Sequence, residues 1–168
     1  MKDGRELRAW VIAVGVLCLT GCEDPPPPEA CAGPDDPSVA LANRDEGRNE
    51  LVVGGEIEVF DAPQGGVFAE LDVTVSDMGL SELEYLRVTV DDPNTGEQLA
   101  FARYFGNSVP LRCSEDGLLE MSRMPLGFVQ MYRVEDLDGR AVTLTGALET
   151  ETDEFPTEYE VVLRGVPY

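Results

Sequence analysis

The sequence predicts an all-β protein, an antiparallel β-sandwich of the immunoglobulin or fibronectin kind. Several stretches after residue 48 alternate apolar and polar residues with a period of two, a pattern typical of strands with one buried and one wetted face. Turn-forming residues recur between these stretches at spacings of roughly 8–12 residues. No convincing helix follows the N-terminal region, although "MGLSELEYL" has room for one short turn.

The strand patterns differ in clarity. The clearest are 67–76 ("VFAELDVTVS"), 86–90 ("LRVTV") and 140–149 ("RAVTLTGALE"). Weaker patterns cover 51–60, 98–105, 108–113, 126–134 and 157–166. The turn signals between them are "APQGG", "DMG", "DDPNTG", "FGN", "SEDG", "MPLG" and "DLDG". Because the polar residues fall on one face of each strand, antiparallel pairing is favoured over parallel pairing.

The first 21 residues have the form of a secretion signal. Lys2, Arg5 and Arg8 make a basic head, and the uncharged run "AWVIAVGVLCL" follows it at 9–19. That run is too short for a membrane-spanning helix, which needs about 20 apolar residues. It has the length of a signal-peptide apolar region, roughly 7–15 residues. We therefore expect export from the cytoplasm.

The residues that end this segment, "LTGC" at 19–22, resemble the lipobox of bacterial lipoproteins. The resemblance implies cleavage before Cys22 and attachment of diacylglycerol to its sulfur, with acyl chains such as palmitate anchoring the protein to a membrane. It also implies a location in the bacterial cell envelope. Glu23 stands where an aspartate would favour inner-membrane retention, so the outer membrane is favoured. The alternative is an ordinary signal or short anchor with an unrelated cysteine.

Three segments are therefore expected, namely a signal peptide (1–21), a lipidated tether (22–48) and a β-sandwich domain (49–168). The tether begins "CEDPPPPEACAGPDDPS", and its prolines favour extended polyproline II structure. It holds few apolar groups whose burial would offset the entropy of folding.

Charge and missing residue types exclude several functions. The net charge of −21 opposes binding to nucleic acid or anionic lipid headgroups by repulsion. The chain has no histidine, and its only lysine is Lys2, so histidine-based nucleophilic catalysis and Schiff-base chemistry in the exported part are excluded. A pair of carboxylates suffices for a glycosidase, but among 33 acidic residues any pair can be proposed. No cofactor is expected.

Two cysteines remain once Cys18 is removed with the signal and Cys22 is lipidated. An even pair in an oxidising compartment predicts a disulfide between Cys31 and Cys113. The alternatives are two free thiols and, less favourably, a zinc site.

The acidic loops offer candidate cation ligands, although no metal site is predicted. Asp91, Asp92 and Asn94 lie in "DDPNTGE", while Asp136 and Asp138 lie in "EDLDG". Calcium prefers six to eight oxygen ligands. However, the first segment also fits a hairpin turn with a glycine bulge, and the second lacks the remaining ligands of a calcium loop. Both are interpreted as turns, and the late run "ETETDEFPTEYE" as a solvated loop.

The aromatic residues offer a possible stacking platform for a sugar. Tyr104, Phe105, Phe128 and Tyr132 would form it if they were exposed, although aromatics at strand spacing are more often part of the core.

The leading hypothesis is a non-enzymatic, membrane-tethered lipoprotein whose β-domain binds an unknown envelope or extracellular protein through sheet edges or loops. The alternatives are an envelope protein that binds a cation or small ligand and, less favourably, a carbohydrate hydrolase with two catalytic carboxylates.

Overall fold

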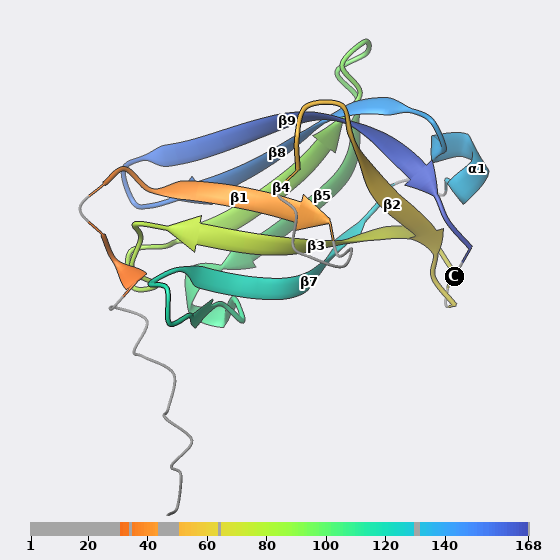
Figure 1. Ribbon diagram of the computed structural model, residues 1–168. Helices are drawn as coiled ribbons and strands as arrows, with labels where there is room; N and C mark the ends of the chain where they lie inside the picture. Colours follow the sequence, from red (N-terminus) through yellow and green to blue (C-terminus); the bar gives the residue numbers. More distant parts are fainter. Residues whose placement is uncertain (1–30, 34, 44–50, 64, 130–131, 168) are drawn as a thin grey trace, which may run out of the picture.

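The computed structural model describes residues 31–33, 35–43, 51–63, 65–129 and 132–167, and it shows a mainly β protein (Figure 1). The signal, Cys22 and most of the expected tether lie outside these residues. Nine strands are β1 (Ser38–Asn43), β2 (Gly55–Asp61), β3 (Val67–Ser76), β4 (Tyr85–Asp91), β5 (Gln98–Phe105), β6 (Arg112–Cys113), β7 (Leu119–Gly127), β8 (Ala141–Glu149) and β9 (Glu154–Gly165).

The strands form one mixed sheet. Its order is β5-β4-β8-β9-β2-β3-β7-β6, and β1 pairs with β3 outside this path. All pairs are antiparallel except β2 with β9, which run parallel from the Gly55–Val161 pair to the Val59–Gly165 pair. The expectation of a wholly antiparallel sheet is therefore wrong at this pair. β8 and β9 form a hairpin, and β9 continues past it far enough to pair with the distant strand β2.

The sheet curls around a single hydrophobic core. β1 and β2 lie one after the other along the same edge of β3, and β1 also contacts β8 and β9 (Figure 1). The backbone N–H of Leu41 in β1 donates to the hydroxyl of Tyr159 in β9, at 3.2 Å. Gly146 in β8 leaves room for β1, since a Cβ there would lie 3.2 Å from Leu41 Cδ1. The core therefore lies between β1 and the β8–β9 hairpin.

Strand β3 confirms the clearest sequence pattern. It spans 67–76, as predicted, and its residues alternate between buried and half-buried along the whole length. β4, β5 and β8 also match predicted segments within one residue at each end. In β4 and β8 most of the apolar residues face the core, whereas β5 also has exposed apolar residues.

Strand β7 corrects two predictions. "MPLG" belongs to this strand and is not a turn. Of the described residues in the stretch predicted as a strand at 126–134, only Leu126 and Gly127 belong to β7, and Phe128 forms an isolated bridge. The cause is a bulge. The register with β3 shifts between Leu71 and Val73, and Arg123 has a φ of 60°. Two consecutive exposed residues, Ser122 and Arg123, interrupt the alternation there.

The folded part begins earlier than the expected boundary at residue 49. β1 lies at 38–43, within the segment predicted as tether, and its Val39 and Leu41 are buried. The prolines and acids that precede it dominate the composition of that segment, so a six-residue strand does not stand out in it.

Helical structure is slight. α1 (Val134–Leu137) is one turn, and η2 (Gly106–Ser108) is a short 3-10 helix. In the part of the chain that the structure describes, no helix has the length and apolar character needed to cross a membrane.

Candidate functional site

The disulfide predicted from the cysteine count is confirmed. Cys31 and Cys113 are bonded, with Cα atoms 5.9 Å apart and a separation of 82 positions in the sequence. Cys113 lies in β6, which pairs with β7, and both cysteines are buried. The bridge therefore fastens the start of the described chain to the body of the sheet.

The segment "DDPNTGE" forms the turn between β4 and β5. One carboxylate oxygen of Asp92 accepts from the backbone N–H groups of Asn94 at 2.8 Å and Thr95 at 3.2 Å. Gly96 has a φ of +71°, a conformation that glycine adopts at little cost. The prediction of a turn with a glycine bulge is therefore confirmed, and the Asp92 carboxylate is used within the turn.

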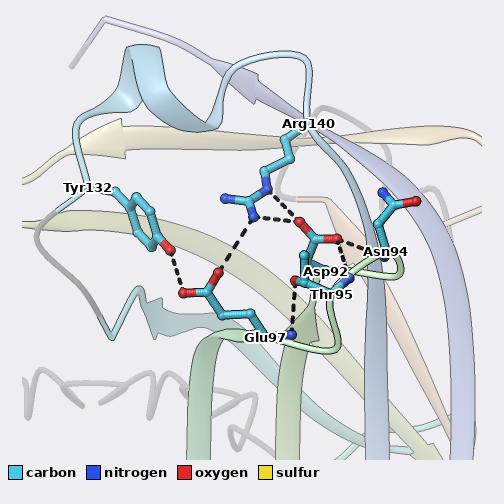
Figure 2. Close-up of polar contacts among 6 residues, drawn as sticks. All are labelled: Asp92, Asn94, Thr95, Glu97, Tyr132 and Arg140. Carbon is cyan, nitrogen blue, oxygen red and sulfur yellow. Dashed lines mark hydrogen bonds and ion pairs between the residues drawn. The ribbon is translucent and has the colours of Figure 1, made fainter.

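The other oxygen of Asp92 binds Arg140, which precedes β8 (Figure 2). The Nη2 atom of Arg140 lies 2.5 Å from this oxygen and 3.9 Å from the nearer Glu97 oxygen. Glu97 in turn accepts from the hydroxyl of Tyr132 at 3.2 Å. Hydrogen bonds from Arg140 and from the turn lower the pKa of Asp92, against the effect of its burial. This network fastens the β4–β5 turn to the loop before β8.

The remaining cation candidates have separate structural roles. Asp91 accepts from the hydroxyl of Thr89 at 3.0 Å. Asp136 accepts from the backbone N–H of Arg133 and so caps α1, while Asp138 accepts from Gly165 N–H at 2.8 Å. Across the described ranges, no three acidic or cysteine side chains gather as they would to hold a metal ion.

The late acidic run is partly neutralised by arginines from neighbouring strands. Arg87 in β4 binds Glu149 at 2.7 Å and also pairs with Glu154, and Arg103 in β5 binds the other Glu149 oxygen at 2.7 Å. Burial raises the pKa of Glu149, but the two arginines outweigh it and hold the pKa below its usual value. Arg103 also lies over the ring of Tyr85, 3.6 Å from its centre.

The four aromatic residues considered for a sugar-stacking platform do not form one exposed surface. Phe105 is 58% exposed and its ring lies 5.0 Å from that of Tyr85. Tyr104, Phe128 and Tyr132 are partly buried against the core.

An exposed apolar surface nevertheless follows β5. The described residues include five exposed large hydrophobic side chains, and three of them lie on β5 or beside it: Phe101, Phe105 and Val129. Val129 is fixed there because its backbone N–H donates to the carbonyl of Leu99. We define these three residues together with Arg103 as the β5-edge surface. Its phenylalanine and arginine side chains are of residue types that are enriched at protein interfaces.

A hollow of about 700 Å³ adjoins the β5-edge surface. Phe105 and Tyr85 line one part of it, and Glu82, Glu84 and Glu151 line another. It lies where β5 ends, β4 begins and the β8–β9 turn passes. The apolar edge and an acidic hollow are therefore continuous through Phe105.

Sequence reasoning named Phe105 but not Phe101, Arg103 or Val129. The alternation in "QLAFARYF" placed the first two on one face with Phe105. However, β5 carries apolar residues on both faces, so its pattern does not say which face is wetted. Val129 was assigned to a strand that does not form. No protein-family model matches the chain, and no curated protein matches it either.

Proposed function

We propose that the chain is a membrane-tethered, extracytoplasmic lipoprotein whose folded part is a non-enzymatic interaction module. The observation that carries this proposal is the β5-edge surface. Phe101, Arg103 and Phe105 lie on β5, an end strand of the sheet path, and Val129 lies beside it. Three of the four members are large and apolar. Contiguous exposed apolar residues on a soluble domain mark binding surfaces more often than scattered ones do.

The finer architecture proposed is a β-sandwich of the immunoglobulin or fibronectin kind. Its support is the way in which β1 faces the β8–β9 hairpin across the core, with Leu41 against Gly146 and Tyr159. In a sandwich, residues from two inner faces meet in this manner. The parallel contact of β2 with β9 would then be the place where the chain joins the two layers.

The proposed anchor is the lipid on Cys22, with the outer membrane of the bacterial envelope as the favoured location. Its support is the sequence "LTGC" after an uncharged run, followed by the proline- and acid-rich residues that start at Glu23. On this proposal, the disulfide marks the end of the tether. The β5-edge surface would therefore bind its partner at some distance from the membrane.

Photo-crosslinking in intact envelopes tests the interaction module. We would place a photoreactive phenylalanine analogue at Phe105 in the full chain, and at the exposed turn residue Glu115 as the matched control. We expect Phe105 to give a discrete protein adduct that the Glu115 position does not give. Adducts of equal yield at both positions, or none at either, would contradict the proposed function.

A further inference from the structure

We propose that the outer edge of β5 accepts an extended, basic segment of a partner protein as an added strand. This inference rests on the proposed function and specifies the chemistry of its partner. Three features of the described residues carry it, namely the direction of the β5 backbone groups, the absence of the usual edge protection, and the distribution of charge.

The backbone of β5 offers hydrogen-bonding groups away from β4. In antiparallel pairing, successive residues direct their N–H and C=O groups to alternate edges. The carbonyls of Leu99 and Phe105 are directed outward and are already occupied, because they accept from the backbone N–H groups of Val129 and Val109, respectively. The outward groups open to a partner therefore lie between these two ends of β5. Gly106 donates inward to Glu84, in agreement with this alternation. The N–H and C=O of Arg103 must therefore also face outward.

No other strand in the described ranges covers this edge. β5 ends the sheet path, and beyond β4 it has only the isolated bridge between Ala100 and Phe128. β7 also lies within side-chain reach of β5 farther along, since the hydroxyl of Tyr104 donates to the carbonyl of Pro125 at 3.1 Å. Apart from this bridge, no strand pairing joins β5 and β7 in the described residues.

The edge lacks several of the features that discourage strand addition. Natural edges are blunted by short strands, proline, lysine, bulges or inward-pointing charges. The one bulge in the pairing of β5 with β4 lies at the start of β5, between Gln98 and Ala100. β5 has eight residues and no proline. Its one charged side chain, Arg103, lies over Tyr85 and is paired with Glu149. The residues exposed beside the edge are instead Phe101 and Phe105.

The two sides of an added strand would meet different surroundings. On the inner side lie Ala102 and Tyr104, which are only partly buried against the core. Apolar side chains of the added strand would cover the exposed parts of these two residues. On the outer side lie the rings of Phe101 and Phe105, followed by the acidic hollow. Cationic side chains suit aromatic rings next to carboxylates. The fitting segment therefore alternates apolar and basic residues.

Charge also decides against a second copy of this chain as the occupant. The chain carries −21, so two copies brought edge to edge repel each other, whereas a basic partner is attracted. The arginine on β5 does not reverse this, since its charge is offset by Glu149.

Binding of a ten-residue peptide of alternating valine and lysine to the full chain tests the inference, with fluorescence anisotropy as the readout. Arg103→Pro removes the outward N–H but leaves β5 as an edge strand, where proline is tolerated. Arg103→Ala removes the same side chain and keeps the N–H, so it is the matched control. Losing main-chain bonds to the added strand should weaken binding about ten-fold in Arg103→Pro relative to Arg103→Ala.

Two further peptides keep the test valid if Arg103→Pro fails to fold. A valine–lysine peptide with methylated backbone nitrogens has the same charge but cannot pair as a strand, and a valine–glutamate peptide pairs but has the opposite charge. We expect neither to bind the unmodified chain. Equal binding of the methylated peptide would overturn strand addition, and equal binding of the glutamate peptide would overturn the basic chemistry.

The remaining outcomes separate this inference from the proposed function. If the valine–lysine peptide does not bind while Phe105 still crosslinks a protein in envelopes, the interaction module stands and the basic strand is wrong. If the peptide binds but no envelope adduct forms at Phe105, the proposed function fails. Self-association that Arg103→Pro abolishes and Arg103→Ala does not would show that a second copy occupies the edge.

Discussion

At the scale of single residues, Asp92 shows how an acidic loop is used for structure. Its two oxygens serve the β4–β5 turn and Arg140, and it is only 7% exposed. The sequence predicted the turn because aspartate, proline and glycine have local preferences for it. The partner Arg140 lies 48 positions away, and local patterns carry no information on such a contact.

Arg140→Ala should make the free energy of unfolding less dependent on pH in the acidic range. The pKa of Asp92 in the fold is below its ordinary value of 3.8, chiefly because of Arg140. Asp92 therefore contributes stability that is present above pH 3.8 and is lost as the pH falls through the lower, folded value. The variant should be less stable than the parent at neutral pH, and the difference should shrink below pH 3.8 in urea unfolding series.

The exposed Arg112 provides the comparison for this experiment. Arg112→Ala should change the free energy of unfolding by a small amount that does not vary with pH in the same range. A difference for Arg140→Ala that stays constant down to low pH would show that Asp92 does not depend on that arginine.

At the scale of elements, period-two alternation found the strands whose alternation is unbroken. β3 alternates along its whole length, and β8 alternates until Gly146. β7 was missed because its bulge at Ser122 and Arg123 breaks the alternation, and β1 because it is short and follows a proline-rich segment. The β5-edge surface was missed for a related reason, since strand order, and with it the identity of the edge, depends on pairings between distant segments.

Leu41→Ala tests whether β1 is part of the core. Leu41 is fully buried, so truncation should lower the free energy of unfolding by about 2–5 kcal/mol. Val52, an exposed aliphatic residue nearby in the sequence, is the control, and Val52→Ala should change it by less than about 0.5 kcal/mol. If both variants change the free energy of unfolding by an equally small amount in chemical denaturation, residues 38–43 are part of the tether and not of the core.

The disulfide between Cys31 and Cys113 should contribute strongly to the free energy of unfolding. Its loop spans 82 positions, for which the chain-entropy model gives about 4 kcal/mol. Replacing both cysteines by serine should lower the melting temperature, and a reducing agent should then have no further effect. If reduction leaves the melting temperature of the parent unchanged, the bridge contributes nothing to the fold.

At the scale of the whole molecule, the negative charge of the chain and the proposed tether both favour a folded part that stays away from the membrane surface. On the proposed cleavage before Cys22, removal of residues 1–21 takes away a net charge of +1, and the remaining chain carries −22. Such a chain is repelled by anionic headgroups, and a proline- and acid-rich spacer after a lipid would hold it away from them. The choice of partner follows from the same charge, because long-range attraction selects basic proteins.

The anchor prediction concerns the single cysteine of "LTGC". Cys22→Ser should abolish labelling by a radioactive fatty acid and the associated cleavage, while Cys18→Ser should leave both intact because Cys18 lies in the segment to be removed. Labelling that persists in Cys22→Ser would rule out the lipoprotein assignment without affecting the β-domain.

Amide hydrogen exchange along β5 tests the central claim, an open outer edge, most directly. Ala102 and Tyr104 direct their N–H groups toward β4, and Arg103 directs its N–H outward, because of the alternation fixed by Leu99 and Gly106. In the free chain, the Arg103 amide should exchange rapidly, as in exposed loops, while those of Ala102 and Tyr104 are protected. The valine–lysine peptide should then slow exchange at Arg103 and leave exchange at Ala102 and Tyr104 unchanged. Protection of Arg103 equal to that of its two neighbours in the free chain would show that the edge is already covered, and would contradict the proposed addition of a strand to β5.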